Sequence, residues 1–383
     1  MKKVFDFVTK SRFWEYFYLG FLFFVFFTGV TSFLVFKENV APLLWLNEYK
    51  EDVFIILSRI FLIREFLSLI IFLWENKGVS KSNFNDFLKK ILLFIVVFLV
   101  FYGTKRKTYA TYALLVMKAN ETDFDSVMKS YVYGKGAGII LWIVTYLAGL
   151  LTVIDYGRGY TFGMSHYNDA AFTICFFLIA VWYLYGQRKN VAFTIIFLVA
   201  ALVCYKPINS RTAVVTMVMM AVMLWTVFPY LKSSRKPAWV DKAVEYYPII
   251  MLGIAVILSV IVHFRGELID YTMDGRFKEI ARGYFDRGLK LCADPYSGEL
   301  DGYILDNTYG NFIYKRGLIF TILALFEFVL SNKRIMKNKD CAMALISLYL
   351  FTYGQMEYVV KGELLLVFAI YYFCKTIKKE ETD

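Results

Sequence analysis

The stretch ILLFIVVFLVFYG, residues 91–103, is apolar almost throughout and shows no alternation of apolar and polar side chains. A membrane β-barrel is built from segments of about ten residues in which the two kinds alternate. Comparable apolar runs recur along the chain, and many reach the ~17–25 residues that a membrane-spanning helix needs. The stretch therefore favours helix over strand, and its recurrence predicts an all-α, polytopic integral membrane protein.

The composition leads to the same prediction. Of the 383 residues, 59% are hydrophobic and 19% aromatic, whereas soluble domains are about 45–50% apolar. The N-terminus is basic and then apolar over a long run, which favours a retained first span over a cleaved signal peptide. We expect one transmembrane domain, 1–383, with about twelve spans. They lie near 14–36, 53–74, 91–103, 109–118, 136–154, 169–185, 191–204, 212–230, 248–263, 310–330, 341–355 and 363–374.

The distribution of charge predicts the topology. The net charge is +11, and Lys and Arg gather in the cytoplasmic connections of membrane proteins. The basic segments NKRIMKNK (332–339) and KTIKKEETD (375–383) predict that both termini lie in the cytoplasm and that the spans cross a plasma membrane. Residues 264–309 then form a large extracytoplasmic loop. Within it, the apolar spacing of 275–294 predicts an amphipathic helix, either in the membrane interface or as a cap on the spans.

Several function classes find no support in the sequence. The five cysteines are scattered and form no CxxC pair, so neither a metal site nor a disulfide framework is indicated. The chain has no phosphate-binding loop, no dinucleotide-binding glycine pattern and no HExxH. We expect no cofactor, no metal and no nucleic-acid partner.

Polar residues gather in four segments that this topology places on the outer side. The segments are YGRGYTFGMSHYNDAAF (156–172), CYKPINSRTAV (204–214), the large loop 264–309, which ends in DGYILDNTY (301–309), and YGQMEYVVKGELLL (353–366). Charged residues at membrane depth are costly and usually functional. We therefore expect the four segments to converge on one site.

These segments resemble the bacterial polysaccharide repeat-unit polymerases of the Wzy type, in the O-antigen ligase/polymerase superfamily. The resemblance covers the second half of the chain, from Tyr156 to the tail, and no such motif lies in the first four spans. It rests on five segments in a shared order: RGYTFGMSHYNDAA (158–171), INSRTAV (208–214), DGR (274–276), LDNTYGNFIYKRGLI (305–319) and MEYVVKGELLLVF (356–368).

The resemblance implies a metal-independent glycosyltransferase that acts at the outer leaflet. Such enzymes polymerise undecaprenyl-diphosphate-linked oligosaccharide repeat units into a surface polysaccharide, so donor and acceptor are both lipid-linked. Further partners would be membrane lipids, a flippase and a chain-length regulator. A ligase that moves a finished glycan to another acceptor is the nearest alternative. A lipid-linked oligosaccharide flippase is the alternative of another class, although its charges should lie nearer the bilayer midplane.

The chemistry of the reaction suggests roles for individual residues. Guanidinium groups suit a leaving diphosphate because they bind phosphate in a bidentate manner and stay charged. A base near the acceptor hydroxyl would take its proton. Asp306 and His166 are the candidates for this base, and a third alternative is that neither residue takes the proton. We assign catalysis to Asp306, His166 and Arg211. We assign substrate binding to Arg158, Arg276, Asn168, Asn307, Tyr309 and Glu357.

Structural roles compete with several of these assignments. Asn168 and Asp169 are suited to cap the sixth span. Glu357 has Lys361 four residues on, which favours an ion pair as much as a substrate contact. Arg64 and Glu65 lie inside the second span, where buried pairing and substrate contact are both open.

Overall fold

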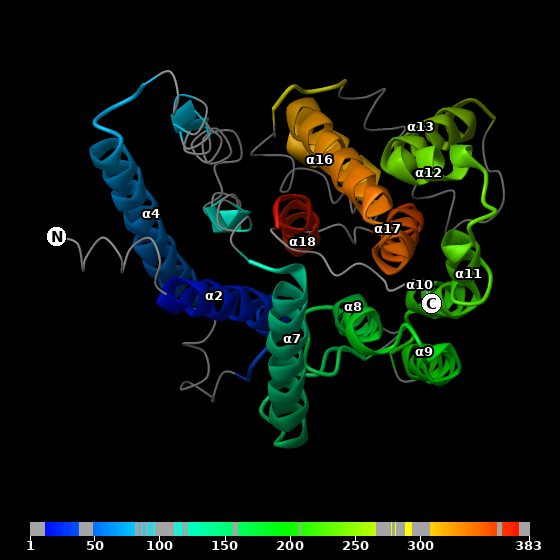
Figure 1. Cartoon of the computed structure of the whole chain (residues 1–383). Coiled ribbons are helices and arrows are strands. Elements are labelled where there is room, and N and C mark those ends of the chain that lie inside the picture. Colours follow the sequence, from blue (N-terminus) through cyan, green and yellow to red (C-terminus); the bar gives the residue numbers. More distant parts are fainter. Residues whose placement is uncertain are drawn as a thin grey trace. The chain divides into compact units, whose positions relative to one another are not determined.

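The computed structural model describes most of the chain (Figure 1). The described residues are 12–37, 49–80, 122–155, 160–206, 208–265, 288–292, 307–357 and 362–374, with 84, 87, 88, 91, 92, 95, 111, 112, 114–116, 119, 277 and 280. Their regular elements are helices, and extended pairing in this part of the chain is limited to isolated bridges. The prediction of an all-α protein is therefore confirmed.

Among the described residues, three helices are long and apolar enough to cross a membrane. They contain Arg12–Thr31, Asn168–Tyr185 and Tyr247–Phe264, and four shorter apolar helices accompany them. Other predicted spans, at 91–103 and 109–118, lie largely outside the described residues. The predicted span 136–154 begins too late, because the helix there starts at Phe124. The first half of this helix is polar, and the apolar run that marks a span begins only in its second half.

The chain divides into two compact units. The described helices of the first are α2 (Arg12–Thr31), α4 (Lys50–Glu75) and α7 (Phe124–Leu147). Helices α2 and α7 pack closely, because a Cβ at Gly134 would meet the carbonyl oxygen of Phe23 at 2.5 Å and one at Gly138 would meet Val30 Cβ at 2.7 Å. Small residues four apart commonly allow such approach between membrane helices.

The charged pair inside the second predicted span is satisfied within this unit. Arg64 is 3% exposed and forms an ion pair with the adjacent Glu65. Its guanidinium also lies 5.9 Å from the centre of the Trp14 ring of α2, a favourable cation–π geometry. Of the two roles that the sequence left open, buried pairing is the one that the structure shows.

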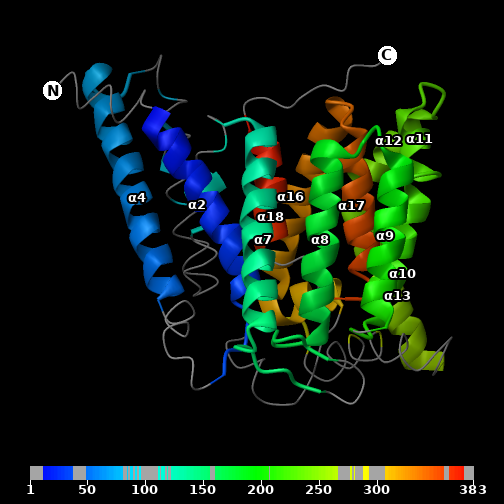
Figure 2. The same cartoon turned by 90° about the horizontal axis from the view of Figure 1, so that it is seen from below.

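The second unit holds the four polar segments. Its helices run side by side in Figure 2, with α8 and α9 antiparallel and joined by a short turn. The elements are α8 (Tyr167–Tyr185), α9 (Asn190–Tyr205), α10 (Arg211–Met223), α11 (Val227–Lys232), α12 (Ala238–Glu245), α13 (Tyr247–Arg265), α15 (Thr308–Gly310), the π-helix η3 (Asn311–Arg316), α16 (Gly317–Lys337), α17 (Cys341–Tyr353) and α18 (Gly362–Phe373).

Aromatic and polar contacts join the last three helices. Phe328 of α16 packs edge-on against Phe351 of α17 and Phe368 of α18, with ring centres 4.7 and 5.2 Å away. Nearby, the buried Asn332 accepts a hydrogen bond from Ser347 at 2.7 Å and donates to the Val244 carbonyl at 2.8 Å. Because α12 ends at the next residue, Asn332 satisfies a carbonyl that the end of a helix leaves without an intrahelical partner.

Asp340 joins α8, α17 and α18 at one end of the unit. Its Oδ2 accepts hydrogen bonds from the hydroxyls of Tyr183 and Tyr371, each at 3.1 Å. Its Oδ1 accepts from the Met343 backbone N–H at 2.9 Å and so caps α17. A buried carboxylate is tolerated because these three donors replace its hydration.

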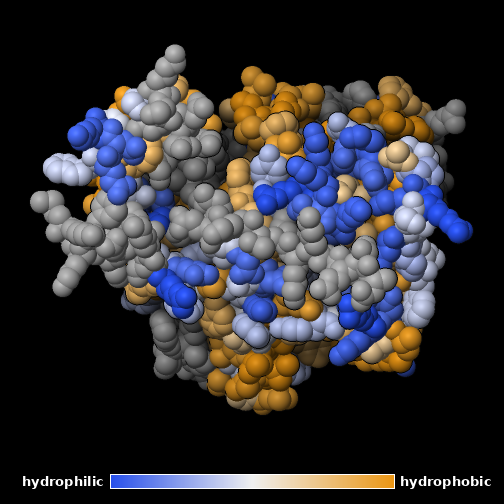
Figure 3. All heavy atoms as spheres, in the orientation of Figure 1, coloured by the Kyte–Doolittle hydropathy of each residue, from blue (hydrophilic) through white to orange (hydrophobic). Residues whose placement is uncertain are grey.

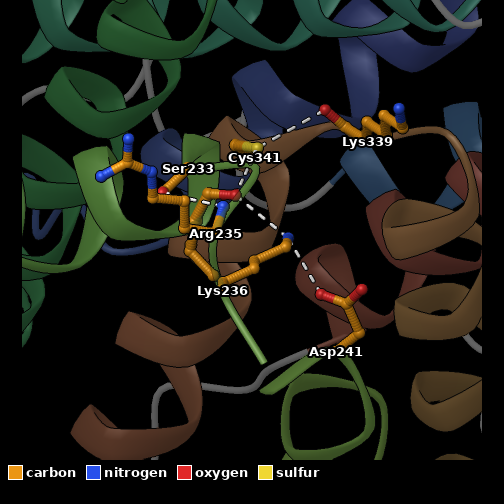
Figure 4. A network of polar contacts seen from close by, with 7 residues as sticks. Ser233, Arg235, Lys236, Asp241, Lys339 and Cys341 are labelled. Carbon is orange, nitrogen blue, oxygen red and sulfur yellow. Dashed lines mark hydrogen bonds and ion pairs between the residues drawn. The ribbon is translucent and has the colours of Figure 1, made fainter. Parts of the chain in front are cut away.

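A second network holds the α11–α12 connection beside the start of α17 (Figure 4). The Lys236 ammonium donates to the Leu231 carbonyl at 3.0 Å and pairs with Asp241 at 2.9 Å. The Cys341 thiol donates to the same carbonyl at 3.4 Å. Hydrophilic side chains gather on the face of this unit seen in Figure 3. Lys337, at the end of α16, and Lys339, in the turn before α17, are exposed.

Candidate functional site

Before α8, the described residues Asp155 and Tyr160 form an isolated antiparallel bridge. Thr161 is fully buried, and its hydroxyl accepts from the Ile154 backbone N–H at 3.0 Å. Phe162 and Gly163 follow with φ of +50° and +84°. Glycine adopts positive φ readily, but a phenylalanine there is strained. Strain of this kind clusters at functional sites, and here it turns the chain into α8.

His166 caps α8. Its Nδ1 accepts from the Asn168 backbone N–H at 3.2 Å, so the prediction that Asp169 caps the helix is wrong. Asp169 instead lies in the first turn and accepts from the Ser165 hydroxyl at 2.8 Å, where its charge also suits the helix dipole. Because Nδ1 is an acceptor, a neutral His166 carries its proton on Nε2. That nitrogen is then a hydrogen-bond donor and not a base.

Asn168 connects three of the four polar segments. Its Oδ1 accepts from the hydroxyl of Ser210 at 2.7 Å, and its Nδ2 donates to the Glu357 carboxylate at 3.5 Å. Ser210 is 1% exposed and Glu357 3% exposed. Ser210 precedes α10 but leaves the helix without a side-chain cap, because its hydroxyl is directed at Asn168.

The segment at α15 is bound to the segment that follows α17. The Thr308 hydroxyl donates to the Glu357 carbonyl at 2.8 Å, and its backbone N–H donates to the Gly354 carbonyl at 2.9 Å. Asn307 caps α15 and donates from Nδ2 to the Gln355 carbonyl at 2.7 Å. The four polar segments therefore converge on Glu357 and its neighbours, with Asn168 at the centre.

The predicted site residues differ in where the structure places them. Asn168 and Glu357 lie in direct contact, His166 caps the same helix, and Arg211 is exposed at the start of α10, next to Ser210. Asn307 and Tyr309 are 0% and 1% exposed. The remaining three, Arg158, Arg276 and Asp306, lie outside the described residues.

The side chains of Asn307 and Tyr309 form hydrogen bonds inside the protein. The Oδ1 of Asn307 accepts from two backbone N–H groups, of Tyr309 and Gly310, at 2.8 and 3.1 Å. The Tyr309 hydroxyl donates to the Phe351 carbonyl at 2.8 Å. The polar atoms of both side chains are therefore buried and hydrogen-bonded within the protein.

A π-helix and a glycine direct the start of α16. The π-helix η3 spans Asn311–Arg316, and short π segments often occur at functional sites. Gly317 follows with φ +83°, and a Cβ there would meet the Cys292 carbonyl carbon at 2.6 Å. The Leu318 and Ile319 N–H groups donate to the Lys290 and Leu291 carbonyls at 2.9 and 3.0 Å.

The large loop is thereby bound to the start of α16. Phe277 and Ile280 are helical and buried, in agreement with the predicted amphipathic helix, but residues 288–292 are not helical. The prediction of a helix through 294 is wrong there, because the backbone of this segment pairs with α16. The Tyr314 hydroxyl adds a bond to the Ile280 carbonyl at 2.8 Å.

Sequence reasoning missed two residues of the site, Ser210 and Thr308. Both lie within quoted motifs, yet nothing in a single sequence shows which hydroxyl of a motif reaches another segment. In the part of the chain that the structure describes, no group of three or more His, Cys, Asp or Glu side chains has the arrangement of a metal site.

Comparisons with known proteins identify no family for the chain. No protein-family model matches the sequence, and neither a curated protein nor a solved structure matches it.

Proposed function

We propose that the chain is a membrane glycosyltransferase that polymerises undecaprenyl-diphosphate-linked oligosaccharide repeat units at the outer leaflet. The proposal includes a bundle of about twelve spans with cytoplasmic termini and an extracytoplasmic site. The donor already contains the activated bond, so the reaction needs no nucleotide.

One observation carries the proposal: the contact of Asn168 with both Ser210 and Glu357. These residues lie 42 and 189 positions from Asn168, in motifs that resemble those of the polymerases. The hydroxyl of Thr308 connects a further motif to the Glu357 backbone at 2.8 Å. Alternation of the spans alone would bring these segments to the same end of a helix bundle, but it would not require these motif residues to be in hydrogen-bond contact.

The reaction assigns distinct tasks to the residues around this contact. The bond between the donor's anomeric carbon and its diphosphate oxygen breaks, and the acceptor hydroxyl oxygen bonds to that carbon. The exposed Arg211 stabilises the leaving diphosphate, a task for which guanidinium groups are suited. Asp306 takes the proton of the acceptor hydroxyl, and the neutral His166 donates from Nε2, since its Nδ1 is engaged with Asn168.

Removal of the chain from its host tests the proposal. Lipid-linked glycans are extracted and sized by mass spectrometry. Single repeat units on the lipid carrier, exposed at the outer leaflet, are expected. Full-length polymer left on its carrier would instead support the ligase. Repeat units confined to the inner leaflet would support the flippase, and an unchanged distribution of surface glycan lengths would exclude all three.

Substitutions of Arg211 test the assigned site. Arg211→Lys keeps the charge but loses the bidentate geometry, so transfer should fall about tenfold or more, given that charged hydrogen bonds contribute about 1.5–3 kcal/mol. The matched control is Arg188→Ala, an exposed arginine in the turn after α8. Wild-type chain lengths in both Arg211→Lys and Arg211→Ala, at equal protein level, would show that Arg211 takes no part.

A further inference from the structure

Two connections of the second unit, α11–α12 and α16–α17, carry exposed basic side chains. Arg235 lies in the first connection, Lys337 ends α16, and Lys339 lies in the turn that follows it. Helix α16 starts beside the candidate site, and its 21 residues extend over about 30 Å. These three residues, called the basic surface below, therefore lie at the end of α16 that is remote from the candidate site.

Hydrogen bonds hold the two connections together. The Leu231 carbonyl accepts from the Lys236 ammonium at 3.0 Å and from the Cys341 thiol at 3.4 Å. Helix α11 packs on α17, and α12 packs on α16. Figure 4 shows Arg235 and Lys339 on either side of this network, with their charged ends directed away from it. The backbone beneath the basic surface is therefore fixed, while its charges face outward.

The acidic side chains of this region are already engaged. Asp241 pairs with Lys236 at 2.9 Å, and Glu245 pairs with Lys242 at 2.6 Å. The buried Asp340 accepts hydrogen bonds from two tyrosine hydroxyls. Among the described residues, no member of the basic surface forms an ion pair. Its positive charge is therefore not compensated within this part of the protein.

Helix α12 lies at the depth expected for lipid headgroups. It ends two residues before the apolar helix Tyr247–Phe264, which is long enough to cross a membrane. Its Val240 and Val244 are buried, whereas Trp239 is 68% exposed and the following Tyr246 is 48% exposed. Exposed Trp and Tyr beside basic side chains are typical of the boundary between hydrocarbon and water. The anions available at this boundary are the phosphodiesters of acidic phospholipids.

We propose that the basic surface binds the headgroups of acidic phospholipids, with Trp239 as its anchor in the headgroup layer. The guanidinium of Arg235 is suited to bind one phosphodiester in a bidentate manner, and the two ammonium groups contact further phosphates as point charges. A lipid layer fits better than a single soluble anion, because the charged ends of Arg235 and Lys339 lie on opposite sides of the network in Figure 4. The inference rests on the proposed spans and not on the proposed glycosyltransferase activity.

Lipid retention by the purified full chain tests the proposal. The protein is exchanged into mixed micelles that contain equal amounts of phosphatidylglycerol and phosphatidylcholine, and the bound lipids are counted by native mass spectrometry. Wild type should retain phosphatidylglycerol in preference to phosphatidylcholine. Arg235→Gln/Lys339→Gln should lower this preference about tenfold, given the usual contribution of a base near an anionic lipid surface. Trp239→Ala should retain less of both lipids at the wild-type preference, and unchanged retention would show that Trp239 is not an anchor.

Lys206→Gln/Lys290→Gln is the matched control. It removes the same charge from two exposed lysines, one in the segment before α10 and one beside the start of α16, and it should keep the wild-type preference. Equal losses in the two double variants would show that net charge alone attracts the lipid, which contradicts the proposal. Equal retention of both lipids by wild type would also contradict it. Glycerol phosphate, which has no acyl chains, should not displace phosphatidylglycerol, and displacement at equal concentration would show a site for soluble anions instead.

Discussion

Replacing Asn168 by aspartate tests the central contact of the candidate site with almost no change of shape. An aspartate keeps an oxygen for the Ser210 hydroxyl, but it places a second carboxylate oxygen 3.5 Å from Glu357 in place of the amide nitrogen. Two unit charges at this separation repel by about 5 kcal/mol at an effective dielectric constant of about 20. The pair can avoid this repulsion by binding one proton.

Proton binding limits the loss and makes it depend on pH. Keeping one carboxyl protonated at pH 7 costs about 4 kcal/mol, at 1.36 kcal/mol per unit above an ordinary pKa near 4. The folded-state pKa of the pair is raised, so the folded protein binds more protons than the unfolded one. The penalty is therefore small at pH 4–5, grows as the pH rises and becomes constant above the raised pKa.

Unfolding of purified Asn168→Asp in detergent at pH 5 and pH 8 measures this effect. We expect a loss of about 1–2 kcal/mol at pH 5 and of about 4–5 kcal/mol at pH 8 relative to wild type. Asn168→Ala is the control. It leaves the buried Ser210 hydroxyl without its partner, which costs about 1–3 kcal/mol with little dependence on pH. An aspartate variant as stable as wild type at pH 8 would show that Asn168 and Glu357 are not in contact.

The remaining predictions concern the scaffold of the site. Gly317→Ala should cost at least about 2 kcal/mol, because its φ of 83° and ψ of 168° are nearly exclusive to glycine and alone account for about 1–3 kcal/mol, and because the new Cβ meets backbone atoms. Gly253→Ala, in open space, should cost nothing. Asp340→Ala should cost about 3 kcal/mol or more, because a cap and two phenol bonds to a carboxylate are lost, and Tyr183→Phe should cost about a third of that. His166→Asn should keep the stability of α8, since asparagine caps helices well, whereas His166→Ala should lose about 1 kcal/mol. Each is read as an unfolding free energy in detergent, and equal effects within any of these pairs would contradict the contact concerned.

The bounds of a helix were predictable from the sequence where an apolar run covers most of that helix. The predicted spans at 169–185 and 191–204 differ by one or two residues from α8 and α9. The predicted span 136–154 begins twelve residues after the start of α7. The first half of α7 buries Gly134 and polar residues against a neighbouring helix, so no apolar run marks it. Apolar content reports contact with lipid, and it says little about a helix face that packs on small residues.

The convergence of the polar segments was also predictable. Which of their residues are buried and which are exposed was not. Alternation of sides along a chain of spans is enough to place Asn168 and Glu357 at one end. Nothing in the sequence shows that Asn307 is entirely enclosed while Arg211 is exposed. Burial is decided by how α15 meets the end of α17, a contact between segments that no local pattern specifies.

The geometry around His166 narrows the question of which group takes the proton. A histidine whose Nδ1 caps a helix must give up the cap to become a base at that nitrogen, and its Nε2 already holds a proton when neutral. His166→Asn retains the cap and a hydrogen-bond donor but no titratable nitrogen. If transfer by this variant keeps the pH profile of wild type, proton removal belongs to another group, and Asp306 is the candidate that the sequence offers. If the variant's profile differs from that of wild type, His166 exchanges a proton during the reaction and the cap must open in each cycle.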